Sequence, residues 1–361
     1  MAVLEHLWLS DFRNYTELDW QPASGRSVIG GRNGQGKSNL VEAIALIGSM
    51  ASFRGAPTDA LVRAGAERAV VRAQVLVDDR RLLIEMELSR GRPNRVQVNK
   101  QRVQRRADLV GLVPVTVFGP DDLELIKGGP GLRRDFLDDL LVQLHPSHGR
   151  TRAEVERVLK QRNALLRSAH GRMSADIEAT LAVWDAKFVA AGEAWADARA
   201  DLVTRLAPRV GEAYDHLAGV HHDVELVYAP EWRAIGLAAA LDQVRNDEVR
   251  RGVTLVGPHR DELVVALASL PARTQASQGE QRTLALALRI AGHHEIAAIC
   301  RTSPLLVLDD VFSELDGGRV DALMSLLVAD QTFVTTAAST APVTADAGWW
   351  TVTSGTVTPG R

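Results

Sequence analysis

Hydrophobic and polar positions alternate with a period of two along much of the first 118 residues, and this pattern predicts strands. Residues 78–79 and 91–94 supply turns between neighbouring strands, while the first two strands are close enough to form a hairpin. Residues 39–50 instead carry apolar side chains at helical spacing. The predicted strands are 3–9, 16–20, 27–29, 69–77, 82–88, 95–98 and 113–118.

The pattern changes at a cluster of glycine and proline at 128–131, after which apolar residues recur at helical spacing as far as about residue 217. His170-Gly171 interrupts this region, and strict heptads are not sustained, so we expect a helical lobe without a long coiled coil. Strand and helix patterns return afterwards. The predicted strands are 224–228, 253–256, 263–267, 305–308, 332–335 and 349–352, and the predicted helices are 280–300 and 319–329.

A glycine-rich loop follows the predicted strand 27–29 and opens the predicted helix 39–50. It matches the phosphate-loop pattern G-x-x-x-x-G-K-[ST] at every fixed position. Backbone N–H groups of such a loop wrap a phosphate chain, and the helix N-terminus adds positive potential. We expect Lys37 to reach the β- and γ-phosphates of ATP and Ser38 to offer its hydroxyl to Mg²⁺. The loop residues are Gly31, Arg32, Asn33, Gly34, Gln35, Gly36, Lys37 and Ser38.

An apolar strand at 305–308 ends in two carboxylates, Asp309 and Asp310. A buried strand would carry Asp309 to the edge of a nucleotide cleft, where it would hold Mg²⁺ through water. Asp310 would then lie where a base for the attacking water is needed. An acidic turn after a strand is common in isolation, but the phosphate loop favours the functional interpretation for both residues.

The segment Ser277-Gln278-Gly279-Glu280-Gln281 precedes a long apolar helix and forms a capping box, with Ser277 as N-cap. In ATPases of the ABC type, a similar loop binds the γ-phosphate held by the opposing subunit. A serine hydroxyl, glycine N–H groups and a helix N-terminus suit that role. We therefore expect Ser277, Gln278 and Gly279 to contact nucleotide in trans, with Gln278 departing from the commoner glycine.

The order of these motifs resembles the SMC-like branch of the ABC ATPases and, within it, the RecF family along nearly the full chain. The segments that carry the resemblance are 11–15, 31–38, 118–123, 127–138, 257–263, 277–282 and 308–316. The resemblance implies an ATP-dependent homodimer with two composite ATP sites that binds double-stranded DNA and hydrolyses ATP slowly. It also implies work with RecR and RecO to direct RecA onto single strands at gapped or stalled DNA.

We therefore predict an α/β fold in which a P-loop ABC-type ATPase head lobe is built from both chain ends. That lobe would comprise residues 1–127 and 223–361, and residues 128–222 would form an inserted, mainly helical lobe. A transporter-associated ATP-binding subunit is the alternative. The histidine that many ABC ATPases carry after the strand following the carboxylate site is absent, because the strand ends Phe333-Val334-Thr335-Thr336. RecF-like proteins often have threonine there, which argues against the transporter alternative.

Composition adds little to the predicted function and bears mainly on where the protein is found. The chain has 361 residues, a formal net charge of -3 and one cysteine, and it contains no apolar run of membrane-spanning length. Its start lacks the features of a signal peptide, so we expect a cytoplasmic protein. The mild negative charge does not exclude basic patches that bind nucleic acid.

The sequence alone leaves two interpretations, structural and functional, for several polar residues. Arg13 and Asn14 would either touch nucleotide, by resemblance, or form a turn between strands. His259 and Arg260 would either contact DNA or nucleotide or make a structural turn. Residues 118–122 take the place of a glutamine loop without a convincing glutamine. The candidate phosphate contacts, which are more often simply solvated, are Arg102, Arg105, Arg106, Arg133 and Arg134.

Overall fold

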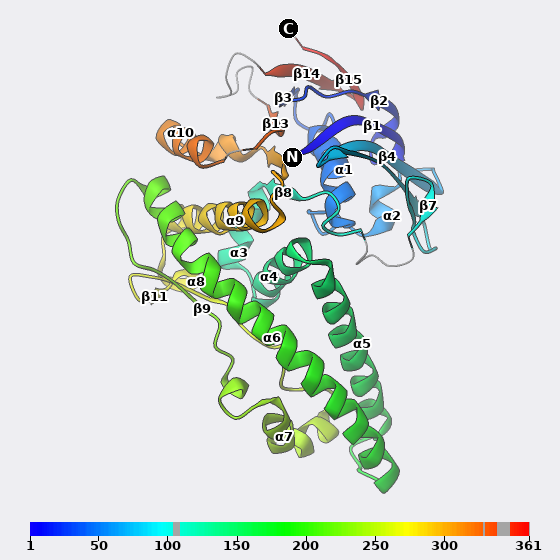
Figure 1. The fold of residues 1–361 in the computed structure, drawn as a ribbon, viewed down its shortest axis with the longest axis vertical. Coiled ribbons are helices and arrows are strands. Elements are labelled where there is room, and N and C mark those ends of the chain that lie inside the picture. The colour runs from blue at the N-terminus through cyan, green and yellow to red at the C-terminus, as the bar shows by residue number, and fades with distance from the viewer. Residues whose placement is uncertain (104–108, 328, 338–346, 361) are drawn as a thin grey trace. The chain divides into compact units, whose positions relative to one another are not determined.

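The computed structural model describes residues 1–103, 109–327, 329–337 and 347–360, and it divides into two compact units. Unit 1 consists of residues 1–123, 212–221 and 282–361, and unit 2 consists of residues 124–211 and 222–281. The predicted lobe boundary at residue 223 differs from this division, because residues 222–281 group with the preceding helices. Unit 1 joins both chain ends, so that blue and red strands are neighbours in Figure 1.

The first sheet of unit 1 is antiparallel and has the order β2-β1-β4-β5-β6-β7. The predicted first hairpin is confirmed, since Leu7 of β1 pairs with Trp20 of β2. Asp78 and Asp79 both have positive φ, which is the two-residue turn geometry that matches strand twist. The strands are β1 (Ala2–Phe12), β2 (Tyr15–Trp20), β4 (Arg68–Val77), β5 (Arg80–Ser89), β6 (Arg95–Val98) and β7 (Gln101–Arg102).

The second sheet has the order β15-β14-β3-β13-β12-β8 and is parallel except for its edge strand β15. Strands β12 and β13 are buried along their whole length, as expected for strands covered on both faces, and β12 is an apolar run up to Asp309. The strands are β3 (Arg26–Gly30), β8 (Val115–Phe118), β12 (Leu305–Asp309), β13 (Thr332–Thr336), β14 (Gly348–Thr353) and β15 (Thr356–Pro359).

Helix α1 (Lys37–Ser49) packs against strands of both sheets, and its residues Leu40, Ile44 and Ile47 are buried in one apolar core with side chains from each. This position fixes the N-terminus of α1 at the carboxyl end of β3, where ligands bind in open parallel sheets. The other helical segments of unit 1, besides the last turns of α6 (Ala175–Ala218), are α2 (Thr58–Leu61), η2 (Pro120–Leu123), most of α9 (Gln278–Cys300), η4 (Val311–Glu314) and α10 (Gly317–Leu326).

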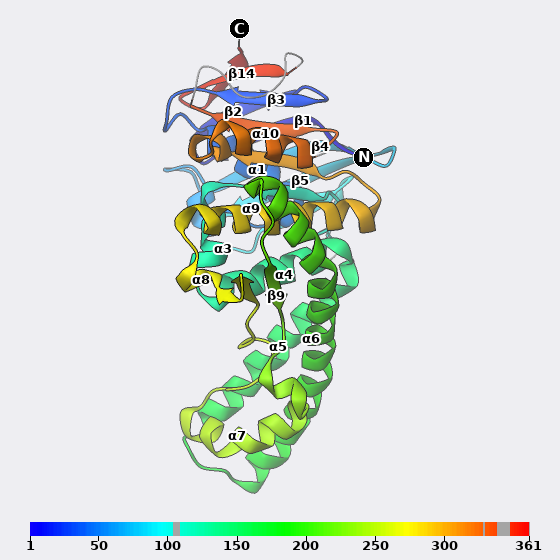
Figure 2. The same ribbon diagram turned by 90° about the vertical axis from the view of Figure 1, so that its left-hand side faces the viewer.

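Unit 2 is mainly helical. Helices α5 and α6 run antiparallel, as Figures 1 and 2 show, and the chain reverses between them near His170 and Gly171, as predicted. The helices are α3 (Glu124–Lys127), α4 (Pro130–Leu144), α5 (Pro146–Ser168), α6 (Ala175–Ala218), whose last turns belong to unit 1, η3 (Glu231–Ala234), α7 (Leu237–Arg251) and α8 (Ala272–Gln275). A small sheet contains β9 (Val224–Val227), β10 (Val264–Leu267) and β11 (Leu270–Pro271).

Buried arginines connect the elements of unit 2. Arg162 of α5 is fully buried and binds Asp185 of α6, Glu248 of α7 and the Thr254 hydroxyl, at 2.6 to 2.8 Å. The predicted strand at 253–256 is wrong, because side chains satisfy the backbone hydrogen bonds of this segment. Thr254 donates its N–H to Asn163 and Leu255 donates to Glu248, so side chains replace a neighbouring strand as hydrogen-bond partners.

Candidate nucleotide-binding site

The phosphate loop lies between β3 and α1 in a conformation that requires glycine. Gly36 has a φ of 113°, and a Cβ there would lie 2.5 Å from the Asn14 amide nitrogen. Asn14 donates to the Gln35 carbonyl, and Tyr15 donates its hydroxyl to the Gly36 carbonyl. The first hairpin of the chain therefore holds the loop from one side.

The C-terminal hairpin also holds the loop. Ser354 N–H donates to the Gln35 side-chain oxygen at 2.8 Å, and Gly355 N–H donates to the Gln35 carbonyl at 3.1 Å. Gly31 is equally close to this region, since a Cβ on it would lie 2.5 Å from the Val352 carbonyl oxygen. Neither contact is visible in the loop's own motif, because the partners lie more than 300 residues away in the chain.

Lys37 curls back into the loop that it follows. Its Nζ donates to the carbonyls of Gly31, at 2.7 Å, and Arg32, at 3.1 Å. Burial lowers the pKa of Lys37, and the nearby carboxylates of Asp310 and Asp309 oppose that shift. The ammonium group therefore lies within the phosphate loop, close enough to the two predicted acidic residues to interact with their charges.

Ser38 and Asp309 meet directly, although 271 positions separate them in the sequence. The Ser38 hydroxyl donates to Asp309 Oδ1 at 2.9 Å, and the Thr335 hydroxyl donates to the same oxygen at 2.7 Å. Thr335 is buried on β13, in register with Asp309 on β12. Burial raises the pKa of Asp309, and the two hydroxyl donors oppose that shift.

The sequence marks Thr335 as a threonine where many ABC ATPases carry histidine, but does not predict it as a site residue. Its hydroxyl also accepts the Asp310 N–H at 2.9 Å and so connects both acidic residues. Strand β13 lies between β3 and β12, which brings Thr335 beside the site. The sequence does not reveal this strand order, so it does not predict that Thr335 lies at the site.

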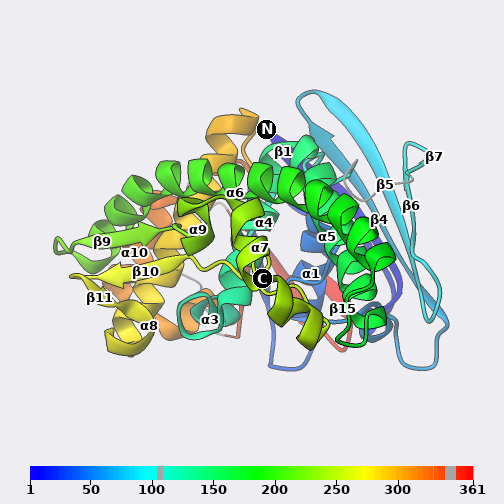
Figure 3. The same cartoon turned by 90° about the horizontal axis from the view of Figure 1, so that it is seen from below.

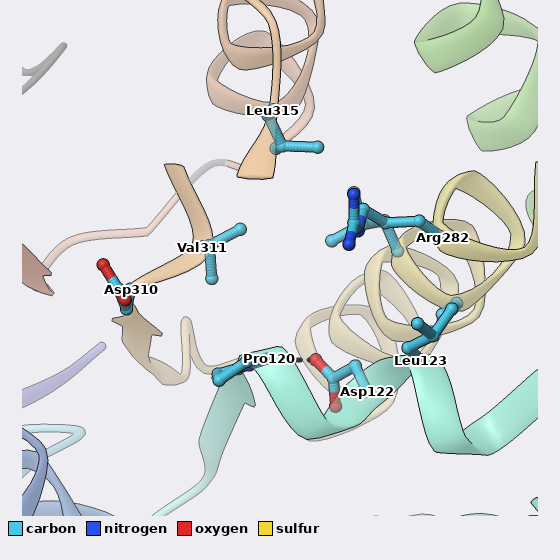
Figure 4. Close-up of a pocket in the computed structure, with 10 residues that line it drawn as sticks. Pro120, Asp122, Leu123, Arg282, Asp310, Val311 and Leu315 are labelled. Carbon is cyan, nitrogen blue, oxygen red and sulfur yellow. Dashed lines mark hydrogen bonds between the residues drawn. The ribbon is translucent and has the colours of Figure 1, made fainter. Parts of the chain in front are cut away.

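Asp310 follows β12 in a left-handed conformation, with a φ of 52°, and is half-buried. It borders two pockets within unit 1. The pocket in Figure 4 is lined by η2, α9 and η4, with Asp310 on one side and Arg282 on the other. The second pocket is lined by residues around α10 and the end of β13. Asp310 is therefore accessible from small hollows rather than sealed inside the core.

The loop at 119–122, which takes the place of a glutamine loop, is tied to α9. The carboxylate of Asp122 accepts the Gly119 N–H at 2.9 Å, drawn as the dashed line in Figure 4, and the Arg289 Nε at 2.7 Å. Burial raises the pKa of Asp122, and Arg289 opposes that shift. Since β8 neighbours β12, this anchored loop borders the pocket beside Asp310.

The segment 277–281 belongs to unit 2 and forms the predicted capping box. Ser277 N–H donates to the Glu280 carboxylate at 2.7 Å, and Glu280 N–H donates to the Ser277 hydroxyl at 3.4 Å. Ser277 and Gln278 are exposed, while Gln281 is buried and donates to the carbonyls of Ala272 and Arg273. The box thus fixes the helix start and leaves the serine side accessible.

The arginine and asparagine of the first hairpin have different surroundings. Arg13 forms a two-pronged ion pair with Glu42, at 2.7 and 2.8 Å, which favours the structural interpretation of that residue. Asn14 contacts the phosphate loop itself, and it also accepts a hydrogen bond from Asn39 at 2.8 Å.

Arg133 is not a phosphate contact, because it is buried and its guanidinium binds Glu262 and backbone carbonyls. Arg134 donates to the Asp261 carbonyl, and His259 contacts the Thr254 carbonyl at 3.1 Å. Burial lowers the pKa of His259 to about 4.

Arg260 is exposed. Arg102 is exposed on β7, while Arg105 and Arg106 lie outside the described residues.

The comparisons with known proteins agree with this geometry. The model of the RecF/RecN/SMC N-terminal domain matches residues 3–351. A DNA replication and repair protein RecF from Streptomyces avermitilis is 43% identical over 92% of each chain. The one from Acidothermus cellulolyticus is 42% identical over 92% of this chain and 93% of its own.

Solved structures give the same result. A structure of the recombination mediator protein RecF with ATP, from the RecFOR pathway, has a TM-score of 0.92 at 27% identity, over 100% of this chain and 98% of its own. The Smc head domain of Pyrococcus furiosus has a TM-score of 0.57 at 17% identity, over 99% of this chain and 95% of its own, and shares the fold. Across the described part of the chain, no helix is both long and apolar enough to cross a bilayer. The predicted fold class is confirmed, and the chain belongs to the RecF family of DNA replication and repair proteins.

Proposed function

We propose that this chain binds and hydrolyses ATP at the phosphate loop, and that ATP serves as the switch for dimerisation and for binding duplex DNA. The observation that carries the proposal is the meeting of Ser38, Asp309 and Thr335 beside Lys37. Two polar side chains from the start of α1 converge with one each from the carboxyl ends of β12 and β13, which a merely structural glycine turn does not require.

In the proposed site, loop residues 31–36 present N–H groups to the phosphates, and the Lys37 ammonium leaves the Gly31 and Arg32 carbonyls to bind the β- and γ-phosphates. Ser38 and Asp309 would hold Mg²⁺ with a hydroxyl and a carboxylate, which are oxygen ligands of the kind this ion prefers. The described residues contain no group of three or more His, Cys, Asp or Glu side chains suited to a metal, so most of its ligands would be phosphate and water oxygens.

Asp310 is proposed to accept the proton of the attacking water. It is one methylene shorter than the glutamate usual at this position, which would place the base less well and slow turnover. Ser277, Gln278 and Gly279 of one copy would bind the γ-phosphate held by the other, so a homodimer would complete two composite sites. The exposed serine at the start of a capped helix supports this role.

The RecFOR pathway named for the solved RecF structures supports RecR and RecO as partners. We propose that the ATP-bound dimer holds duplex DNA near single-strand junctions, that RecR and RecO act with it to load RecA, and that hydrolysis releases the DNA. Slow hydrolysis would suit a switch better than a motor, because the ATP-bound state must last long enough for partners to assemble.

The test measures binding of a labelled duplex to the protein at fixed salt, with ATP, with ADP and without nucleotide. We expect binding with ATP alone, and its loss in Lys37→Ala and in Ser277→Arg. Lys37→Ala should lose ATP itself, whereas Ser277→Arg should keep ATP bound to a monomer.

Equal binding in all three nucleotide states would show that ATP is not the switch. A complete absence of duplex binding by the folded, ATP-binding wild type would overturn the proposal.

A further inference from the structure

The edge of the antiparallel sheet of unit 1 carries an unbalanced positive charge. The chain as a whole has 42 basic and 45 acidic residues, yet no acidic residue lies between Leu88 and Val103. We call residues 90–102 the edge hairpin; it includes β6, β7 and the turn before β6. Its basic residues are Arg90, Arg92, Arg95, Lys100 and Arg102, and all five are exposed.

Three of the four arginines on β4 and β5 of the same sheet are paired with acidic partners, and Arg80 is the exception. Arg68 contacts Glu87 at 3.3 Å and Arg72 contacts Glu85 at 3.5 Å, each across the β4–β5 ladder. Arg81 forms an ion pair with Glu5 at 3.1 Å. The charge on the inner part of this face is therefore largely balanced.

The edge hairpin differs. Among the residues that the structure describes, Arg92, Lys100 and Arg102 have no hydrogen bond or ion pair. Arg95 lies opposite Glu87 in the β5–β6 ladder, but the carboxylate of Glu87 bonds to Arg68. Arg90 donates to the Val62 and Arg63 carbonyls and keeps its charge uncompensated by a carboxylate.

The backbone presents these charges in a fixed arrangement. Arg95 and Arg102 share one face, since Arg102 pairs with Gln97, two residues along β6 from Arg95. The alternate residue Val96 is buried in the core, so that face is the solvent side. Asn99 and Lys100 have φ values of 51° and 66°, which form a tight turn that places Lys100 at the end of the hairpin. Figure 3 shows β6 and β7 outermost, beyond β5 and β4.

We propose that the edge hairpin is a binding surface for the sugar-phosphate backbone of duplex DNA. This inference rests on the DNA-binding function proposed above and names the surface that would carry it. A four-residue strand spans about 13 Å, and a duplex presents roughly eight phosphates over that length. Uncompensated, exposed cations along such a strand match that density of charge. The hairpin contains no aromatic residue on which bases could stack, so its cations would contact the duplex through phosphates.

Edge strands also carry charge simply to prevent association with other sheets. That role requires charge of either sign and makes no demand on DNA binding. The two explanations therefore differ in what neutralising the arginines does to duplex affinity.

The experiment compares the full-length wild type with Arg92→Gln/Arg102→Gln by fluorescence anisotropy on a labelled duplex, with ATP, from 50 to 200 mM salt. Each lost phosphate contact should reduce the slope of log affinity against log salt by about 0.9, so the slope should flatten by about 2. Duplex affinity at the low-salt end should fall about tenfold. ATP turnover without DNA and ATP-dependent dimerisation should be unchanged, because neither arginine contacts the phosphate loop.

The matched control is Arg157→Gln/Arg250→Gln, which removes the same charge from two exposed arginines that pair with Glu154 and Asp247 on helices. This control should keep the wild-type slope. An unchanged slope in the hairpin variant, or an equal loss in both variants, would overturn the inference while leaving the proposed function intact. Failure of the wild type to bind any duplex would instead contradict the proposed function.

Discussion

The two units use buried charge in different ways. In unit 1 an extensive apolar core joins both sheets and α1, and two of its buried ionisable groups, Lys37 and Asp309, lie at the phosphate loop. In unit 2 buried ion pairs link the helices: Arg162 binds Asp185 and Glu248, and Arg199 binds Asp138. Unit 1 therefore places buried charge at its proposed ATP site as well as in structural pairs, whereas the buried charges of these pairs in unit 2 fix helix positions.

The largest expected effect is on the stability of unit 2. Replacing Arg162 with Met leaves Glu248, which has no exposed surface, without its cation, and should cost about 3–5 kcal/mol. Hydrogen exchange across α5, α6 and α7 with urea unfolding would measure the loss. The Arg157→Met control on the same helix removes an exposed pair and should cost less than about 1 kcal/mol. Equal costs would show that the buried network does not hold unit 2 together.

Replacing Asp310 with Asn tests whether an acidic residue at the proposed ATP site of unit 1 acts in catalysis rather than in stability. Turnover of ATP should fall at least about a hundredfold, because the proposed base is lost, while ATP affinity and melting temperature stay close to wild type. Ser313→Ala offers a control at a neighbouring residue whose hydroxyl bonds only to the Asp310 carbonyl among the contacts seen. Unaltered turnover in Asp310→Asn would remove this residue from the chemistry.

The free energy of unfolding should depend on pH through His259 of unit 2. His259 has a folded-state pKa of about 4, below its ordinary value of 6.5, because burial disfavours the charged ring. The unfolded chain therefore binds the proton more tightly, and stability is lost as pH falls from about 6.5 toward 4. Between pH 7 and pH 5 the loss should be about 2 kcal/mol. Urea unfolding of the wild type and of His259→Gln should diverge over this range, and parallel curves would contradict the assignment.

The smallest expected effect is at Thr335. Replacing it with Val removes one donor to Asp309 and the acceptor for the Asp310 N–H, at similar volume. We expect a stability cost of about 1 kcal/mol and a higher Mg²⁺ concentration for half-maximal turnover. Thr335→Ser keeps the hydroxyl and should restore the wild-type Mg²⁺ dependence. No shift in that dependence would limit Thr335 to a structural role.

The parts of the fold that depend on local pattern were predictable. The phosphate loop, the acidic strand end, the capping box and the first hairpin each follow from residues close together in the chain. The contacts of Thr335 with Asp309 and of Ser354 with Gln35 were not predictable, because they depend on strand order and on pairing across distant segments. The same limit explains the failed strand at 253–256, whose alternating pattern is satisfied by side chains of α5 and α7.

The neighbours of β3 have a consequence for the order in which the protein is made. Among the strands that the structure describes, this strand, which leads into the phosphate loop, pairs with β13 and β14, and both come from residues 332–353. About 300 residues must therefore be translated after β3 before this strand has a partner on either side. A chain cut short before β13 would therefore lack both strand partners of β3, and would lack an ordered ATP site although it contains every residue of the loop.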